Sequence, residues 1–308
     1  MYRKIMGFLE AWKENEHRKP LILQGARQVG KTYSILEFGR THYENVAYFN
    51  FETNPKLNET FEENISPDYL IPILSHIAGQ TIVTEKTLIV FDEVQLCERA
   101  LTSLKYFCEN APDYHIIVAG SLLGVAVNRA KFSFPVGKVD MKTLYPMDME
   151  EFMLALGEDD LVEQIKKCFQ TDTPLPSALH DAAMQLYRQY LVVGGMPECV
   201  MQFAETKDYI LVRHTQDTIL ASYLNDMSKY NNLNEIKKTR LAYDNITVQL
   251  SKKNTRFQYK LIKKGGRASE FENAIEWLCL SGIVSQVYKV EQIKKPLENY
   301  RDIDAFKI

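Results

Sequence analysis

The sequence has no apolar run long enough to cross a membrane and no paired cysteines. Spanning a bilayer takes about 18 consecutive apolar residues. Residues 1–20 carry charges throughout and lack both the apolar core and the cleavage site of a secretory signal. The five cysteines are scattered and form no C-x-x-C pair, as is typical of reduced thiols. We therefore expect a cytoplasmic protein without a membrane partner.

Internal repeats and low-complexity tracts are also lacking, and charged residues make up an ordinary 25% of the 308 residues. The small net charge of −3 hides an asymmetry. Residues 229–270 hold eleven Lys and Arg against three Asp and Glu, a net charge of +8, which leaves −11 for the rest of the chain. A basic block on an acidic chain indicates a polyanionic partner such as DNA or RNA, unless the acidic remainder matches it within the protein.

Short apolar runs alternate with helical stretches over the first half of the chain. Several of the runs are continuously apolar, as expected for strands buried on both faces of a sheet. The candidate strands are residues 20–26, 45–52, 87–95, 114–121 and 138–145. This alternation predicts an α/β fold with a three-layer, largely parallel sheet.

Residues 25–32 read GARQVGKT and match the P-loop pattern G-x-x-x-x-G-K-[ST] between an apolar strand and a helix. Glycines let the loop backbone bend so that its N–H groups face one centre, and the helix N-terminus adds positive charge. We expect Lys31 to reach the β- and γ-phosphates of ATP and the Thr32 hydroxyl to ligate Mg²⁺. The predicted nucleotide-binding residues of this segment are Gly25, Ala26, Arg27, Gln28, Val29, Gly30, Lys31, Thr32 and Tyr33.

A second acidic element fits the same site. The apolar run 88–91 ends in Asp92 and Glu93, the Walker B pattern, which we expect beside the P-loop strand. Asp92 would hold Mg²⁺, and Glu93 would orient and deprotonate the attacking water. A solvated acidic turn is the alternative, and the nearby P-loop motif argues against it.

Two further residues are candidates for the catalytic step. Ser121 ends the next strand, where a hydroxyl can sense the γ-phosphate or cap the following helix; both roles are compatible. Sites of this kind are often completed by an arginine from a neighbouring subunit. Arg129 is our candidate for that role, with Arg27 and Arg99 as weaker ones, and self-association is therefore expected.

These motifs resemble those of the AAA-family ATP-binding proteins of bacteria and archaea, which are related to the archaeal ATPases and the STAND NTPases. The stretches that carry the resemblance are GARQVGKT (25–32), LIVFDEVQ (88–95), VAGSLLG (118–124), residues 134–152, and YLVVGGMPE (190–198). The resemblance implies an AAA-like fold in which Gly195-Met196-Pro197 lies over the adenine, and Pro197 joins the predicted site residues. A helix-breaking turn is the alternative for these three residues.

The pattern divides the chain into four parts: a P-loop ATPase core (1–147), a helical lid (148–228), a winged-helix-like domain (229–292) and a short end (293–308). The resemblance identifies that end as the start of a truncated, restriction-endonuclease-like domain. Winged helices often bind DNA. The second helix of this one carries Glu270, Glu272 and Glu276, which suit a DNA groove poorly, so a structural or protein-contacting role stays open.

Two functions therefore compete. The first is an ATP-hydrolysing switch or motor of the AAA/STAND type. The second is a nucleic-acid-binding or protein-interaction module for which ATP is a regulatory ligand. A GTPase is disfavoured because the sequence has no N-K-x-D guanine signature.

Overall fold

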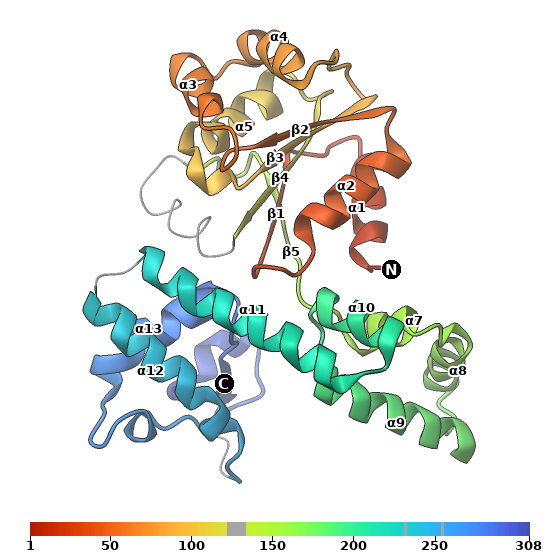
Figure 1. Cartoon of the computed structure of the whole chain (residues 1–308), viewed down its shortest axis with the longest axis vertical. Coiled ribbons are helices and arrows are strands. Elements are labelled where there is room, and N and C mark those ends of the chain that lie inside the picture. Colours follow the sequence, from red (N-terminus) through yellow and green to blue (C-terminus); the bar gives the residue numbers. More distant parts are fainter. Residues whose placement is uncertain (122–133, 231–232, 254–255) are drawn as a thin grey trace. The chain divides into compact units, whose positions relative to one another are not determined.

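The computed structural model describes residues 1–121, 134–230, 233–253 and 256–308 (Figure 1). The chain forms two compact units, Met1–Ile219 and Leu220–Ile308, and the boundary falls within the helix α11, Tyr209–Tyr230. No helix in the described ranges is long and apolar enough to cross a membrane. All five cysteines are free thiols.

The first unit is built around a five-stranded parallel sheet with the order β2-β3-β4-β1-β5. The strands are β1 (Leu21–Gly25), β2 (Asn45–Asn50), β3 (Thr87–Asp92), β4 (His115–Ser121) and β5 (Asp140–Thr143). All five predicted strands are present. From the sequence we expected the Walker B strand β3 to lie directly beside the P-loop strand β1. In the structure β4 lies between these two strands.

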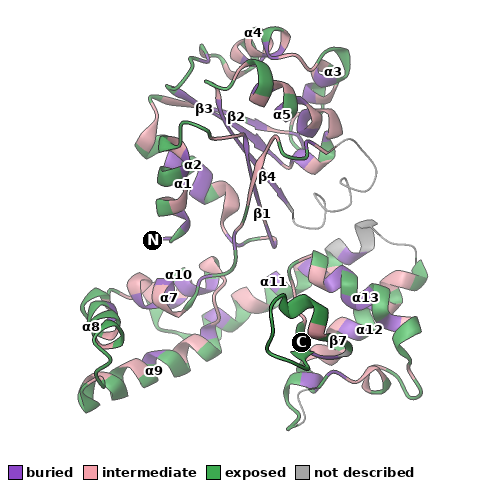
Figure 2. Ribbon diagram, turned by 180° about the vertical axis from the view of Figure 1, so that it is seen from behind, coloured by how far each residue is buried: buried purple, intermediate pink, exposed green. Residues whose placement is uncertain are grey.

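Helices cover both faces of this sheet, which makes three layers (Figure 1). The helices are α1 (Ile5–Glu14), α2 (Lys31–His42), α3 (Lys56–Glu63), α4 (Pro67–Ala78) and α5 (Glu98–Asn110), with a short 3₁₀ turn η1 at Val94–Leu96. Every residue of β3 is buried, as Figure 2 shows for the sheet interior. Phe61 of α3 packs edge-on against Phe91 of β3 at 5.5 Å between ring centroids, within the core on the α3–α5 face.

The rest of the first unit is helical. Its elements are α7 (Met149–Ala155), α8 (Asp159–Gln170), α9 (Ser177–Val193), α10 (Pro197–Thr206) and the first half of α11. Phe152 of α7 stacks on Phe203 of α10 at 6.2 Å and meets Tyr190 of α9 at 5.4 Å. An aromatic cluster thus joins α7, α9 and α10, three of the helices of the predicted lid.

The second unit packs α12 (Leu233–Leu250) against α13 (Ala268–Leu280), with the 3₁₀ turn η2 (Tyr259–Leu261) between them. An antiparallel pair follows, β6 (Val287–Val290) and β7 (Arg301–Lys307), with the 3₁₀ turn η3 at Leu297–Tyr300. The strand β7 lies in the segment that the sequence assigned to a further domain, and it pairs with β6 instead. The two helices and the hairpin have the order expected of a winged helix, and that assignment remains a prediction, as do the four domain boundaries.

Candidate nucleotide-binding site

The carboxyl ends of four strands meet at one edge of the sheet. The strand register places the Ser121 backbone beside Gly25 and that of Asn50 beside Asp92. In open parallel sheets this edge is where ligands bind. The P-loop, the Walker B pair and Ser121 therefore come together, although they are far apart in the sequence.

The two P-loop glycines are needed for different reasons. Gly30 has φ +89°, a left-handed conformation that ends the loop before α2 and favours glycine. Gly25 is needed for close approach: a Cβ at this position would lie 2.3 Å from the Leu144 carbonyl oxygen. Bending was the role expected of both glycines, and the close approach at Gly25 is a further requirement that the sequence did not predict. Gln28 is also left-handed, with φ 62°.

Lys31 lies inside the loop that it follows. Its ammonium donates hydrogen bonds to the carbonyl oxygens of Gly25, at 3.0 Å, and Ala26, at 2.8 Å. Burial lowers the pKa of Lys31 to about 8, although Glu93 and Asp92 oppose this shift. The lysine therefore places a buried donor at the centre of the loop, close to two carboxylates.

The Walker B aspartate is bound to the P-loop helix. Thr32 Oγ1 and Tyr48 Oη both donate to Asp92 Oδ2, at 2.9 and 2.7 Å. Asp92 Oδ1 accepts the Glu93 N–H at 2.9 Å, and Asp92 itself is buried. Desolvation and the bond to Asp92 raise the pKa of Tyr48 to about 12. The structure therefore brings together both predicted metal ligands, Thr32 and Asp92.

Glu93 directly follows the end of β3 with φ 53°, a left-handed conformation that is uncommon for a residue with a side chain. Such conformations cost free energy and cluster at functional sites. Gln95 Nε2 donates to Glu93 Oε2, so the carboxylate is held by its neighbour on the next turn. Glu93 is half-buried, in reach of solvent at the sheet edge.

The remaining candidate residues lie partly outside the described residues. Ser121 ends β4 at the sheet edge, but its side chain lies outside the described residues, as does all of Arg129. Arg99 Nε donates to the Phe61 carbonyl oxygen at 2.7 Å, which ties that side chain to α3. Arg27 is half-buried and lowers the pKa of Lys31 by charge repulsion. Tyr33 is 59% exposed.

The Gly195-Met196-Pro197 turn lies beside the P-loop. A Cβ placed on Gly30 would be 3.7 Å from Pro197 Cγ. Pro197 begins α10, a position that suits proline in a helix. The Gly195 carbonyl accepts the Met147 N–H at 2.6 Å, and a Cβ on Gly195 would lie 2.1 Å from the Met147 oxygen. The segment is both a helix-ending turn and a neighbour of the loop.

Tyr48, Asn50 and Gln95 are site residues that were not predicted from the sequence. Asn50 Nδ2 donates to Tyr48 Oη at 3.2 Å, which orients the hydroxyl that binds Asp92. A signal was present, since Tyr48 and Asn50 are polar residues spaced two apart at the end of an otherwise apolar strand. Gln95 gave no such signal, because the turn that places it beside Glu93 depends on an unusual backbone conformation.

Residues 17–153 match the family model of an AAA domain, and residues 184–308 match that of a domain of unknown function (DUF8612). No curated protein matches the sequence. Segment 17–153, with its parallel sheet, P-loop and Walker B strand, is therefore an AAA-family P-loop domain, and the predicted AAA-like fold is confirmed.

Three similar solved structures follow, and the first of them, with a TM-score above 0.5, supports the fold. A Walker-type ATPase of Pyrococcus abyssi is similar with a TM-score of 0.58 and 13% identity, over 100% of this chain and 93% of that chain. The ORC2 protein of Aeropyrum pernix has a TM-score of 0.47 and 13% identity, over 93% of this chain and 88% of that one. RuvB of Thermotoga maritima has a TM-score of 0.39 and 14% identity, over 92% and 88% respectively.

Proposed function

We propose that this protein binds ATP with magnesium and hydrolyses it, acting as a switch or motor of the AAA/STAND type. The observation that carries the proposal is the hydrogen bond between Thr32 and Asp92, 2.9 Å long. It joins the first turn of α2, the helix that follows the P-loop, to the end of β3. In the sheet β3 lies two places from the P-loop strand β1. A P-loop sequence in a chance loop would not have an acidic strand end in hydrogen-bond contact with its threonine.

The division of labour follows from the geometry. The P-loop N–H groups and the N-terminus of α2 favour the phosphate anions. The Lys31 ammonium adds a positive charge inside the loop, where bound phosphates would replace its two carbonyl partners. Of the two Walker B acids, Asp92 is hydrogen-bonded to Thr32 and Glu93 is not. Glu93 is therefore the acid that accepts a proton from water. Pro197 supplies apolar surface beside the loop, for the adenine or ribose.

The donor set suits magnesium. Mg²⁺ prefers oxygen ligands, takes one or two from the protein, and completes its shell with phosphates and waters. Thr32 and Asp92 offer a hydroxyl and a carboxylate in mutual contact. Bound there, the ion would neutralise phosphate charge, while Tyr48 and the Glu93 N–H keep the Asp92 carboxylate oriented.

Titration calorimetry with ATP and Mg²⁺, together with phosphate release, tests the proposal. The unmodified protein should bind ATP, and Lys31→Ala should abolish binding because the loop loses its only ammonium. Lys86→Met is the matched control: Lys86 makes an exposed ion pair with Glu44, and such pairs contribute little. Equal ATP affinity in Lys31→Ala and Lys86→Met would refute the P-loop assignment.

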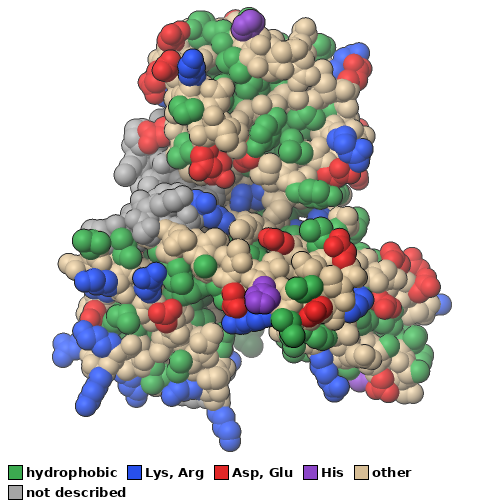
Figure 3. All heavy atoms as spheres, viewed as in Figure 1, with side chains coloured by type: hydrophobic (Ala, Val, Ile, Leu, Met, Phe, Trp, Pro, Cys, Tyr) green, Lys and Arg blue, Asp and Glu red, His purple; other side chains and the backbone are tan. Residues whose placement is uncertain are grey.

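The second candidate function, polyanion binding, is favoured by the loop between α12 and α13. Residues 252–267 contain no Asp or Glu. Their basic side chains are all exposed: Lys252, Lys253, Arg256, Lys260, Lys263, Lys264 and Arg267. Figure 3 shows Lys and Arg side chains projecting from this unit. We propose that DNA or RNA phosphates contact this loop, and that ATP regulates the contact.

The loop is a better candidate for that contact than α13. Phe271, Ile275 and Leu278 of α13 are buried in the unit's own core, while Glu272 and Glu276 face solvent. Acidic side chains on the exposed face of a helix repel DNA phosphates. Binding through the loop therefore implies phosphate contacts without base reading, and hence little sequence preference.

A further inference from the structure

A buried arginine near the start of the chain is hydrogen-bonded to the backbone of the P-loop. Arg3 is 4% exposed, and its guanidinium makes three hydrogen bonds. Nη1 donates to the Val29 carbonyl at 2.9 Å, Nη2 to the Tyr145 carbonyl at 2.8 Å, and Nε to Glu151 Oε1 at 3.1 Å. One side chain thus connects the P-loop, the segment after β5 and the helix α7.

The bond to Val29 fixes the direction of the next N–H group. A trans peptide unit is planar, with its C=O and N–H pointing in opposite directions. Val29 C=O and Gly30 N–H belong to the same peptide unit. Because Arg3 holds the carbonyl on its own side of the loop, the Gly30 N–H is directed away from Arg3. Arg3 therefore sets the orientation of one donor of the P-loop.

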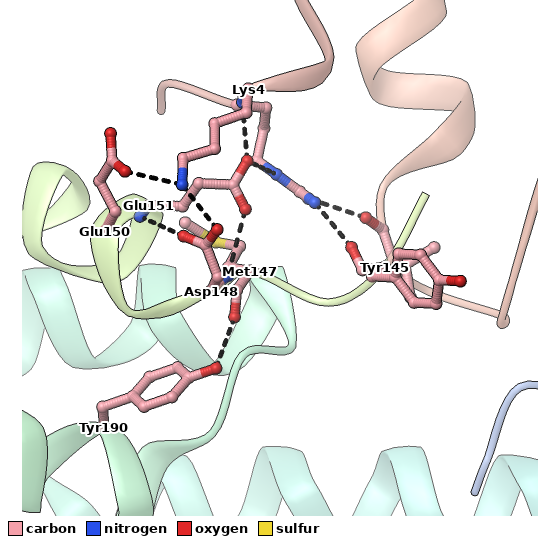
Figure 4. A network of polar contacts seen from close by, with 9 residues as sticks. Lys4, Tyr145, Met147, Asp148, Glu150, Glu151 and Tyr190 are labelled. Atoms are coloured by element: carbon pink, nitrogen blue, oxygen red, sulfur yellow. Dashed lines mark hydrogen bonds and ion pairs between the residues drawn. The ribbon is translucent and has the colours of Figure 1, made fainter. Parts of the chain in front are cut away.

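The other end of the network lies at the start of α7 (Figure 4). Asp148 and Glu151 form a capping box, in which Asp148 Oδ1 accepts the Glu151 N–H and Glu151 Oε2 accepts the Asp148 N–H. Glu151 Oε1 accepts the Lys4 N–H at 2.7 Å as well as Arg3 Nε. The carboxylate that caps α7 is thus the same one that neutralises Arg3.

Burial makes this network costly to break. The side chains of Arg3 and Glu151 are 5% and 7% exposed, and removing one partner leaves an unpaired buried charge. The neighbouring Lys4 pairs with Asp148 and Glu150, each at 2.7 Å, but its side chain is 42% exposed. Lys4 therefore provides a comparison in which the charge is similar and the burial differs.

We propose that Arg3 is a positioning residue that couples ATP occupancy of the P-loop to the capped start of α7. The inference rests on the proposed function, because it concerns the response of the same loop to ATP. A phosphate that accepts a hydrogen bond from the Gly30 N–H affects the Val29 carbonyl, because both belong to the same peptide unit. The Val29 carbonyl is bonded to Arg3, and Arg3 is bonded to Glu151, so the effect reaches Glu151. Pro197 Cγ and Arg3 Nη1 both lie next to Gly30, at 3.7 and 3.5 Å from where a Cβ would stand. The coupling therefore joins the loop to helices at two points.

The first test compares three variants by ATP titration and steady-state kinetics. Arg3→Lys keeps the charge but not the three-way fork, and should raise the ATP Kd by about 5- to 150-fold, the usual range of coupling between sites. KM should rise more than kcat falls, since Arg3 does not touch the reacting atoms. Glu151→Gln should act in the same direction and non-additively with Arg3→Lys. Lys4→Met should leave the Kd within about twofold, as expected for an exposed pair.

Hydrogen exchange on the unmodified chain provides a test that needs no variant to fold. Saturating ATP should slow amide exchange in α7, residues 149–155, and the same change should occur in Lys4→Met. Unchanged exchange in α7 despite bound ATP would overturn the coupling, as would additive effects of Arg3→Lys and Glu151→Gln. A chain that binds no ATP at all would instead refute the proposed function, so the two failures are distinguishable.

Discussion

The Thr32 hydroxyl and the Asp92 carboxylate are joined by a hydrogen bond of 2.9 Å, although sixty positions separate them in the chain. Tyr48 donates to the same carboxylate oxygen at 2.7 Å. Two hydroxyls from α2 and β2 thus orient one buried acid at the end of β3. Because the acid is held in this way, the residue after it, Glu93, is presented at a fixed place on the sheet edge.

Glu93→Gln should leave ATP binding intact and lower turnover by about 100-fold or more, the scale of general-base catalysis. The amide keeps the shape of the side chain and an oxygen that can accept from Gln95, but it cannot take a proton from water. Calorimetry should give an unchanged Kd, while phosphate release slows.

The control for that variant is Glu59→Gln, which changes an exposed carboxylate on α3. It should behave like the unmodified protein in both assays. A Glu93→Gln protein that hydrolyses ATP at the normal rate would show that another group activates the water and that Glu93 only terminates the strand.

Pro197→Ala should raise KM for ATP by about tenfold and leave kcat nearly unchanged. Alanine lacks two of the CH₂ groups of the proline ring, and each buried CH₂ is worth about 0.8 kcal/mol. Contacts with a non-reacting part of the substrate stabilise ground and transition states alike. Alanine is tolerated at the first position of α10, so folding should not suffer.

Pro176→Ala, at the exposed start of α9, serves as the control for Pro197→Ala. Unchanged KM and unchanged preference for ATP over GTP would reduce Pro197 to a turn residue.

Local patterns account for what the sequence predicted, and long-range packing for what it did not. Each run that was assigned as a strand became one, and in β1 and β3 the reason is that a continuous apolar segment has to be buried on both faces. The helix that was expected to carry Glu270, Glu272 and Glu276 is present as Ala268–Leu280. The order of strands is not a local property, so the insertion of β4 between β1 and β3 could not be read from either motif.

The same distinction applies to the site. Lys31, Thr32 and Asp92 were predictable because each belongs to a short motif with a mechanism. Arg3 carries no motif, and its three acceptors come from residues 29, 145 and 151. Its partner Glu151 does belong to a local sequence pattern, because the Asp-x-x-Glu spacing of residues 148–151 is that of a capping box. Two of the three acceptors are backbone carbonyls, which any residue would provide.

His115 should make the protein less stable in mild acid. It is 4% exposed at the start of β4, where its Nδ1 lies 2.7 Å from Tyr43 Oη. Burial, and then the nearby Arg18 and Lys13, lower the pKa of His115 from 6.5 to about 4. Between these two values the unfolded chain binds the proton and the folded chain does not. Stability is therefore present above pH 6.5 and is lost as the pH falls to about 4, by up to about 3 kcal/mol.

Urea denaturation at pH 7 and at pH 4.5 measures this effect. His115→Gln removes the titrating group, so its stability should fall less between the two pH values than that of the unmodified protein. The exposed His17→Gln should follow the unmodified protein. Equal losses in all three proteins would mean that carboxylates, and not His115, govern the acid response.

Reversing the charge of four lysines in the loop between α12 and α13 should abolish nucleic-acid binding and spare ATP hydrolysis measured without nucleic acid. The lysines are Lys252, Lys253, Lys263 and Lys264. Lys263 contacts Glu270 at 3.2 Å, and the variant replaces that attraction with a repulsion at the surface, where the cost is small. Fluorescence anisotropy with duplex and single-stranded oligonucleotides at low salt measures the binding.

Salt provides the physical signature of that contact. If the loop neutralises phosphates, binding to duplex DNA should weaken with a log–log slope of about 0.9 per phosphate. Different sequences should bind nearly equally, because phosphate contacts position a protein without reading bases.

The matched control reverses the charge of four exposed lysines of the first unit, and it should keep both the affinity and the salt slope. These lysines are Lys56, Lys105, Lys167 and Lys207. Binding that both variants lose equally would reflect net charge alone. No binding by the unmodified protein would leave the loop as a solvated face, because exposed cations repel one another least where water and salt screen them.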